Sequence, residues 1–189
     1  QMRDGCPVIC RYQKAGDIFL TIQGLASKRG KGSSSYALQE NGKICLFLGG
    51  AGGAGCSTVA MGCAAALAAQ GRNTIYFSLK QKEENGQFRV SGSSLTDVMY
   101  EIGMWQQLGG TDQGQLQMKL QSMLRKDDET GVYSFAPFDL PVSAMNFGPD
   151  DMQALLHAVG GLCERCVVCA DSYLSSTLLR GIRLADWVI

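Results

Sequence analysis

The sequence has no net charge and no apolar run long enough to cross a membrane. Its 17 basic and 17 acidic side chains cancel, so the chain has no global field that would recruit nucleic acid or an anionic lipid surface. The longest apolar run, residues 59–69, is shorter than the roughly 20 residues of a transmembrane helix. The start of the chain does not resemble a signal peptide either. We therefore expect a cytoplasmic protein without a nucleic-acid partner and with at most peripheral membrane contact.

Histidine is nearly absent, since His157 is the only one in the chain. It lies within an apolar helical pattern, where a core or boundary histidine is more common than a catalytic one. The sequence also shows no plausible partner residues with which His157 would form a catalytic triad. We identify no catalytic residue from the sequence.

Cysteine is plentiful, but its pattern indicates neither a disulfide scaffold nor a metal centre. Disulfide scaffolds are small and loop-rich, whereas four of the eight cysteines lie inside apolar periodic segments. The spacing C-x-x-C-x-x-C begins an iron–sulfur motif, but no fourth cysteine follows and the segment RCVVCAD has the pattern of a buried strand. We expect reduced, metal-free thiols. The four core cysteines are Cys45, Cys56, Cys63 and Cys169, and the spaced group is Cys163, Cys166 and Cys169.

The chain divides into three regions by composition. Residues 1–27 contain a short apolar strand at 8–11 and a loosely spaced helix at 18–25, as at the end of a domain. Residues 28–42 are rich in Gly, Ser and charge, which is typical of a linker. Residues 43–189 begin with a strand, a glycine loop, a helix and a second strand, a βαβ unit that predicts a parallel sheet with helices on both faces.

Strand and helix patterns alternate along residues 43–189. Because the last strand pattern coincides with the end of the sequence, we expect further C-terminal strands in this fold. The predicted strands are 43–48, 73–79, 131–136, 165–171 and 186–189, and the predicted helices are 57–70, 94–102, 113–124, 148–160 and 175–185.

The glycine loop after the first of these strands matches two phosphate-binding patterns, each with one misfit. Gly50, Gly52 and Gly55 fit the dinucleotide pattern G-x-G-x-x-G. Gly50 and Gly55 also fit the P-loop pattern G-x-x-x-x-G-K-[ST], in which Cys56 replaces the lysine. In both patterns backbone N–H groups and a helix N-terminus face the phosphates.

The residues around the loop favour a nucleoside triphosphate with magnesium. The dinucleotide pattern needs an acidic residue after the second strand, where the chain has Lys80, a residue that would suit a 2′-phosphate instead. Ser57 and Thr58 occupy the positions of the P-loop hydroxyls, and Asp171 ends an apolar strand, where a carboxylate would hold Mg²⁺ through water. A tight turn without a ligand is the remaining alternative. The candidate nucleotide-binding residues are Gly50, Ala51, Gly52, Gly53, Ala54, Gly55, Cys56, Ser57 and Thr58, and the candidate Mg²⁺ ligands are Ser57 and Asp171.

Four segments of the chain resemble a known superfamily. The segment LGGAGGAGCSTVAMGCAAALAAQGRNTIYFSL is similar to the deviant P-loop region of the MinD/ParA superfamily. SSLTDVMYEI, GVYSFAPFDLPVSAMNFGPDDMQALLHAV and RCVVCADSYLSSTLLRGIRLADWVI resemble the TadZ/CpaE-type proteins of Tad (Flp) pilus assembly. This resemblance covers residues 43–189. The opening CPVICRYQKAGDIFLTIQGL is similar to the end of the receiver-like domain that those proteins carry ahead of an ATPase-like domain.

The resemblance implies an ATP-binding fold without the groups that hydrolyse ATP. The two lysines of the superfamily's K-G-G-x-G-K-[ST]-T loop fall on Ala51 and Cys56, and its aspartates after the second strand fall on Ser78 and Lys80. Asp171 matches the Walker B aspartate. We therefore expect bound Mg²⁺ and ATP with little or no hydrolysis, the alternative being an active ParA/MinD-like ATPase that uses other groups.

The resemblance also implies partners. Proteins of this superfamily pair face to face across the nucleotide, so we expect a homodimer. A TadZ/CpaE-type protein would contact other pilus-assembly or secretion proteins and be recruited from the cytoplasm to a membrane-bound secretion complex.

Overall fold

A computed structural model describes residues 2–3, 6–7, 43–50, 54–80, 92–107, 109, 113–139, 141–171, 173 and 175–189. The chain forms two compact units, Gln1–Gln39 and Glu40–Ile189. In the first unit, β1 (Met2–Arg3) and β2 (Cys6–Pro7) pair antiparallel. The predicted strand 8–11, helix 18–25 and linker 28–42 lie outside the described residues, so the receiver-like domain stays a prediction.

The second unit contains a six-stranded sheet that is parallel except at one edge. Its strand order is β5-β6-β4-β7-β3-β8, and only β5 and β6 pair antiparallel. The predicted α/β class with a parallel sheet is confirmed. The strands are β3 (Lys43–Gly49), β4 (Thr74–Ser78), β5 (Arg125–Lys126), β6 (Tyr133–Ser134), β7 (Arg165–Asp171) and β8 (Trp187–Val188).

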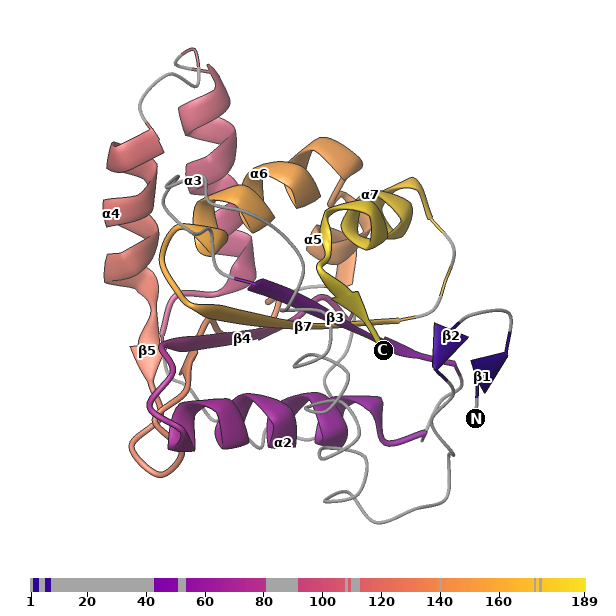
Figure 1. Cartoon of the computed structure of the whole chain (residues 1–189). Helices are drawn as coiled ribbons and strands as arrows, with labels where there is room; N and C mark the ends of the chain where they lie inside the picture. The colour runs from indigo at the N-terminus through magenta and orange to yellow at the C-terminus, as the bar shows by residue number, and fades with distance from the viewer. Residues whose placement is uncertain are drawn as a thin grey trace, which may run out of the picture. The chain divides into compact units, whose positions relative to one another are not determined.

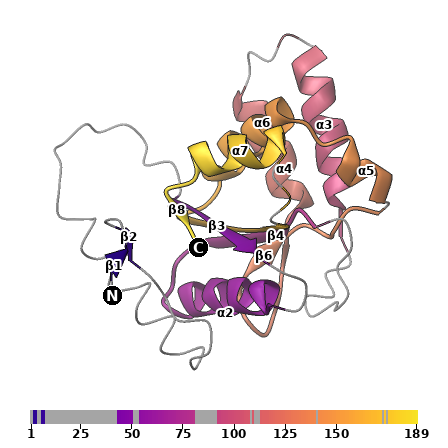
Figure 2. The same cartoon turned by 90° about the vertical axis from the view of Figure 1, so that its right-hand side faces the viewer.

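Helices cover both faces of this sheet, as predicted (Figures 1 and 2). One face packs against α2, and the opposite face lies under the remaining helices. None of the helices in the described part of the chain is long and apolar enough to cross a membrane. The helices are α2 (Cys56–Ala69), α3 (Leu95–Gln107), α4 (Gln113–Met123), α5 (Pro141–Met145), α6 (Pro149–Gly160) and α7 (Ser176–Leu184).

Alternating side chains of β7 build two separate cores. Cys166 and Val168 join the cluster under α3, α4 and α6, whereas Val167 and Cys169 join the cluster under α2. Because both faces of the central strands are buried, these strands appear in the sequence as nearly continuous apolar runs rather than as alternating patterns. This is why β7 matches its predicted range, 165–171.

The sheet departs from prediction at its antiparallel edge. The strand predicted at 131–136 is reduced to the two residues of β6, and its partner β5, like the short helix α5, was not predicted. Both residues of β5 are exposed and basic, so no apolar pattern marks this strand. Helix α3 begins after Ser94, whose Oγ accepts the Asp97 N–H at 3.2 Å while the Ser94 N–H donates to Asp97 Oδ2 at 2.9 Å. These two bonds fix the start of α3 next to the predicted start at residue 94, but α3 continues beyond the predicted end at residue 102.

Candidate functional site

The candidate site lies at the carboxyl edge of the parallel strands. Gly49, at the end of β3, pairs in register with Asp171, at the end of β7. The neighbouring strand β4 ends beside the same part of β7, because Ser78 pairs with Cys169 and the Leu79 N–H donates to the Cys169 carbonyl at 2.8 Å. Residues far apart in the sequence are thus brought to one edge of the sheet.

Helix α2 begins at this edge with an open N-terminus. Its N-cap, Gly55, has a φ of 78°, in the left-handed region that favours glycine, and supplies no side-chain cap. The first turn contains no acidic side chain. Because the first N–H groups of a helix lack intrahelical acceptors and the helix dipole is positive there, this end of α2 favours an anion such as a phosphate.

The P-loop hydroxyls lie in the first turn of α2. Ser57 is half-buried and Thr58 is exposed. The Ser57 Oγ lies 3.8 Å from the Cys169 sulfur, so the start of α2 contacts β7 at this residue. Of the candidate loop residues, Gly50 and positions 54–58 are described, and positions 51–53 lie outside the described residues.

Cys56, which replaces the P-loop lysine, contacts a second thiol. Its sulfur lies 3.5 Å from the sulfur of Cys169, a buried residue of β7. The pKa of the Cys56 thiol is lowered to about 7, chiefly by the hydrogen bond with Cys169 and also by the positive charge of Lys80, while burial and the negative charge of Asp171 oppose this change. The same bond, together with burial, raises the pKa of Cys169. The thiol contact and the nearby ammonium therefore favour the thiolate form of Cys56 at the start of α2.

Lys80 also reaches this site from the segment after β4. Its Nζ lies 3.8 Å from the Asp171 Oδ1. A Cβ atom placed on Gly49 would lie 3.9 Å from the same Nζ and 3.8 Å from the Cys56 sulfur, so the ammonium and the thiol both approach the end of β3. From the sequence, Lys80 was interpreted only as a residue that stands where a carboxylate was expected, or as a partner for a 2′-phosphate. Its approach to Asp171 was missed because nothing in a linear sequence reveals that β4 lies next to β7.

The oxygen ligands at this edge fit a magnesium ion that is held mainly by a nucleotide. Ser57 and Asp171 offer the hard oxygen donors that Mg²⁺ prefers. Among the described residues, no group of three or more His, Cys, Asp or Glu side chains could hold a metal ion. Since Mg²⁺ usually keeps waters and substrate phosphates as ligands alongside one or two protein groups, these residues fit an ion that arrives with the phosphates.

The three spaced cysteines do not converge on one point. Cys166 and Cys169 belong to the cores on opposite faces of the sheet. The Cys163 thiol donates a hydrogen bond to the Val159 carbonyl at 3.4 Å. A single ion or cluster cannot be ligated from both faces of a strand, so the strand interpretation of this segment agrees with the geometry.

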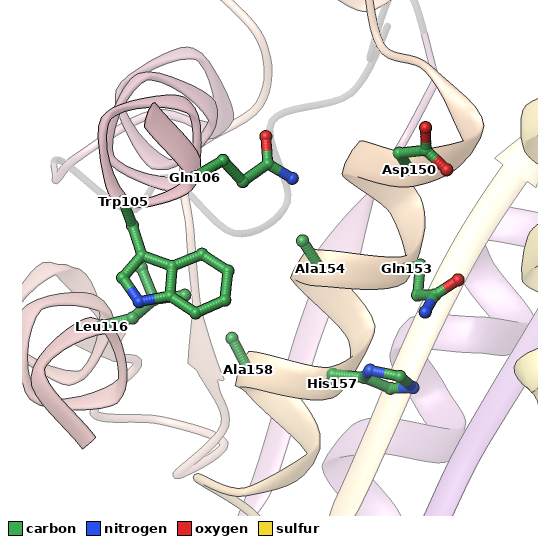
Figure 3. Close-up of a pocket in the computed structure, with 8 residues that line it drawn as sticks. All are labelled: Trp105, Gln106, Leu116, Asp150, Gln153, Ala154, His157 and Ala158. Atoms are coloured by element: carbon green, nitrogen blue, oxygen red, sulfur yellow. The ribbon is translucent and has the colours of Figure 1, made fainter. Parts of the chain in front are cut away.

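His157 lies in a different region from the loop site. It is exposed on α6, so its predicted core or boundary position is wrong, and it lines a hollow of about 330 Å³ between α3, α4 and α6. Figure 3 shows the Trp105 ring extending from α3 toward Leu116 of α4, with Ala158 of α6 facing it. None of the residues lining this hollow belongs to the loop site.

Comparison with solved structures identifies proteins of similar fold. A ParA-family ATPase from Chlorobium tepidum TLS is 14% identical with a TM-score of 0.63, and the match covers 78% of this chain and 59% of that one. The kinase domain of the Escherichia coli tyrosine kinase ETK is 14% identical with a TM-score of 0.63, covering 89% of this chain and 60% of that one. The kinase domain of VpsO is 14% identical with a TM-score of 0.58, covering 92% and 78%.

These matches establish the fold of the chain. No protein-family model matches the sequence, and neither does any curated protein. The chain has the ParA/MinD-like P-loop fold, and it spans 59% and 60% of the first two structures it matches.

Proposed function

We propose that this chain binds Mg²⁺ and ATP at the glycine loop, and that the nucleotide acts as a structural ligand that is hydrolysed slowly or not at all. The observation that carries the proposal is the meeting of three features at one sheet edge: the glycine-capped start of α2, the end of β3 and Asp171 at the end of β7. In a ParA/MinD-like fold, the N-terminus of α2 would bind the phosphate chain, and Ser57 and Asp171 would hold the Mg²⁺ that accompanies it.

Weak hydrolysis follows from the groups at this edge. Phosphoryl transfer needs a positioned water and positive charge where negative charge develops. Ser78 and Lys80 stand where the resemblance expects carboxylates, and neither can act as a carboxylate base. Backbone N–H groups and Mg²⁺ still support binding, so affinity is expected to survive better than turnover.

The biological role rests on the sequence resemblance. We propose an assembly or localisation component of a Tad (Flp) pilus system, working as a homodimer with other secretion proteins at a membrane-bound complex. The lysine that crosses the dimer interface in relatives is Ala51 here, so ATP is expected to influence pairing less than in those relatives. Analytical ultracentrifugation with and without MgATP measures this, and a monomer in both states would exclude the homodimer.

An active ATPase is the second candidate, and one observation favours it. The Lys80 ammonium lies 3.8 Å from Asp171. It therefore supplies some of the positive charge that is lost where Cys56 replaces the P-loop lysine. ATP turnover on the order of one per second, typical of competent phosphoryl-transfer enzymes, would establish this alternative over the structural role.

Thermal unfolding with different nucleotides tests the proposal. A ligand that binds only the folded state stabilises it by about 2.7 kcal/mol at a concentration of 100 times its Kd, so MgATP is expected to raise the melting temperature and NAD⁺ is not. A shift with NADP⁺ alone would favour the dinucleotide alternative. If no nucleotide changes the melting temperature, the loop is a tight turn without a ligand.

A further inference from the structure

We infer that the Lys80 side chain, which follows β4, provides the positive charge that faces the nucleotide's phosphates. It takes the role of the P-loop lysine, whose position is occupied by Cys56 in this chain. The inference rests on the proposed function, because it names a group that binds the same ligand. The ligand class is the phosphate chain of a nucleoside triphosphate. Lys80 acts here as a binding residue.

The position of the ammonium supports this role. A P-loop lysine extends from the start of the helix toward the β- and γ-phosphates. In this chain the start of α2 carries a short thiol, and Lys80 comes to it from the side. A Cβ on Gly49 would lie 3.9 Å from the Lys80 Nζ and 3.4 Å from the Cys56 Cβ. The segment after β4 therefore supplies the charge close to the backbone position from which a lysine at position 56 would extend.

The low exposure of the Lys80 side chain also supports a role in binding a ligand. Its side chain is 20% exposed, whereas lysines usually extend their ammonium groups into water. Asp171 is 58% exposed and its contact with Lys80 spans 3.8 Å. An ion pair of this length with an exposed partner contributes little, so Asp171 alone is a weak reason to hold the lysine against the sheet. An anionic ligand at the uncapped start of α2 supplies a stronger one.

The ammonium and the carboxylate have complementary tasks once the ligand is bound. A magnesium ion near Asp171 would attract the carboxylate, and a phosphate oxygen would attract the ammonium. Each charged group would therefore keep a partner of opposite charge if the contact between Lys80 and Asp171 lengthened on binding. Neither the ammonium nor the carboxylate would then be left buried and unpaired.

Isothermal titration calorimetry with MgATP tests the inference on the unaltered chain and two matched variants. Lys80→Gln is expected to weaken MgATP binding by about 10- to 100-fold, the range of a charge-assisted hydrogen bond. Lys80→Arg, which keeps the charge, is expected to lose much less. The control is Lys43→Gln: Lys43 is also paired with an aspartate, Asp186, but stands at the start of β3. This control is expected to bind MgATP as tightly as the unaltered chain.

A rescue variant separates the role of the charge from damage to the fold. In the Lys80→Gln background, Cys56→Lys places a lysine at the P-loop position and is expected to restore most of the lost affinity. Should Lys80→Gln fold poorly, Lys80→Met keeps the aliphatic stem and replaces it in the same series. A rescue that restores nothing would count against Lys80 as the phosphate-facing charge.

A double-variant cycle with Asp171→Asn excludes an indirect effect. If Lys80 contacts phosphate, Lys80→Gln still weakens binding when position 171 is neutral. If that loss disappears in the Asp171→Asn background, Lys80 only neutralises Asp171, and the inference is wrong.

The calorimetry also distinguishes this inference from the proposed function. Equal MgATP affinity in the unaltered chain and Lys80→Gln would overturn the role of Lys80 and leave ATP binding intact. No heat of binding in the unaltered chain at millimolar MgATP would overturn both.

Discussion

The two edges of the parallel sheet each carry a lysine–aspartate pair, and the pairs are built in opposite ways. At the amino edge, Lys43 Nζ lies 3.4 Å from Asp186 Oδ1, while the other oxygen of Asp186 accepts the Ile44 N–H at 2.8 Å. The carboxylate is anchored there, and the lysine is the more exposed partner, at 49% against 36%. At the carboxyl edge the lysine is the more buried partner, at 20%, and Asp171 is 58% exposed.

From this difference we expect the pair at the amino edge to maintain the fold and the pair at the carboxyl edge to be available to a ligand. The Asp186 carboxylate links the turn before β8 to the backbone of β3, so its partners are internal to the sheet. At the carboxyl edge, the inward ammonium and the outward carboxylate lie beside an uncapped helix start. The amino edge is therefore expected to govern stability, and the carboxyl edge to govern nucleotide binding.

The largest expected effect comes from the two ends of α2. Gly55 before the helix and Gly71 after it have almost the same positive φ, 78° and 79°. A valine at either position is expected to cost about 1–2 kcal/mol of stability, because side chains with a Cβ avoid this conformation. Only Gly55→Val is expected to abolish MgATP binding in calorimetry, since only Gly55 lies at the carboxyl edge.

Urea unfolding of Gly55→Val and Gly71→Val supplies the control for this comparison. Similar losses of stability show that the two substitutions strain the backbone equally. If Gly71→Val also abolishes MgATP binding, the loss reflects a damaged helix, and the assignment of the binding site to the carboxyl edge is contradicted.

The next effect concerns the reactivity of Cys56. Because its pKa is lowered to about 7, this thiol is expected to be substantially ionised at neutral pH, and iodoacetamide is expected to alkylate it about tenfold faster than an ordinary thiol. The rate rises with pH through 7 and levels above 8, because the reacting form is the thiolate. Burial raises the pKa of Cys45 to about 12 and of Cys63 to about 11, so both should stay unmodified.

Peptide mass spectrometry after timed alkylation measures these rates residue by residue. MgATP is expected to protect Cys56, whereas NAD⁺ is not. Uniform labelling of all the described cysteines would indicate that the thiol contact between α2 and β7 does not form.

A smaller effect is expected when the missing lysine is restored at the carboxyl edge. Cys56→Lys adds a charge next to the phosphates and is expected to tighten MgATP binding by about tenfold. Hydrolysis should stay far below about one turnover per second, because the substitution supplies no base for the attacking water. Phosphate release assays and calorimetry on the same preparation measure the two quantities. Rapid turnover in this variant would show that charge alone limits hydrolysis.

The smallest effect is expected at the amino edge. Asp186→Ala removes the contact to Lys43 and leaves the Ile44 N–H without its side-chain acceptor, which is expected to cost about 1–2 kcal/mol in urea unfolding. Asp171→Ala, measured without nucleotide, is expected to cost less, because that carboxylate is mostly exposed. A larger loss of stability in Asp171→Ala than in Asp186→Ala would contradict the view that the amino edge governs stability.

The sequence predicted the central sheet well and its edge poorly. β7 matches its predicted range, because a buried central strand is apolar throughout. β5 consists of Arg125 and Lys126, two exposed residues held by their pairing with β6, and such pairing depends on residues elsewhere in the chain. The start of α3 was predictable because the cap at Ser94 is local, whereas its end depends on packing by Trp105, which the sequence pattern does not reveal.

The candidate site was predictable as far as it is local. The glycine loop, Ser57 and Thr58 are contiguous with one another, and Asp171 was expected at the end of a strand. The approach of Lys80 to Asp171 was not predictable, because it depends on β7 lying between β4 and β3. A strand order is a property of the whole sheet.

That strand order also affects how the polypeptide acquires its structure during synthesis. β3 and β4 are the first two strands of the sheet to be made, yet each is a neighbour of β7 and not of the other. Their central pairings must wait until residues 165–171 have emerged, and such long-range contacts slow folding. In the interval, two apolar strands have unpaired edges and are open to aggregation. Gly49, Lys80 and Asp171 meet only when β7 inserts, so the proposed nucleotide site forms only after this long-range pairing is complete.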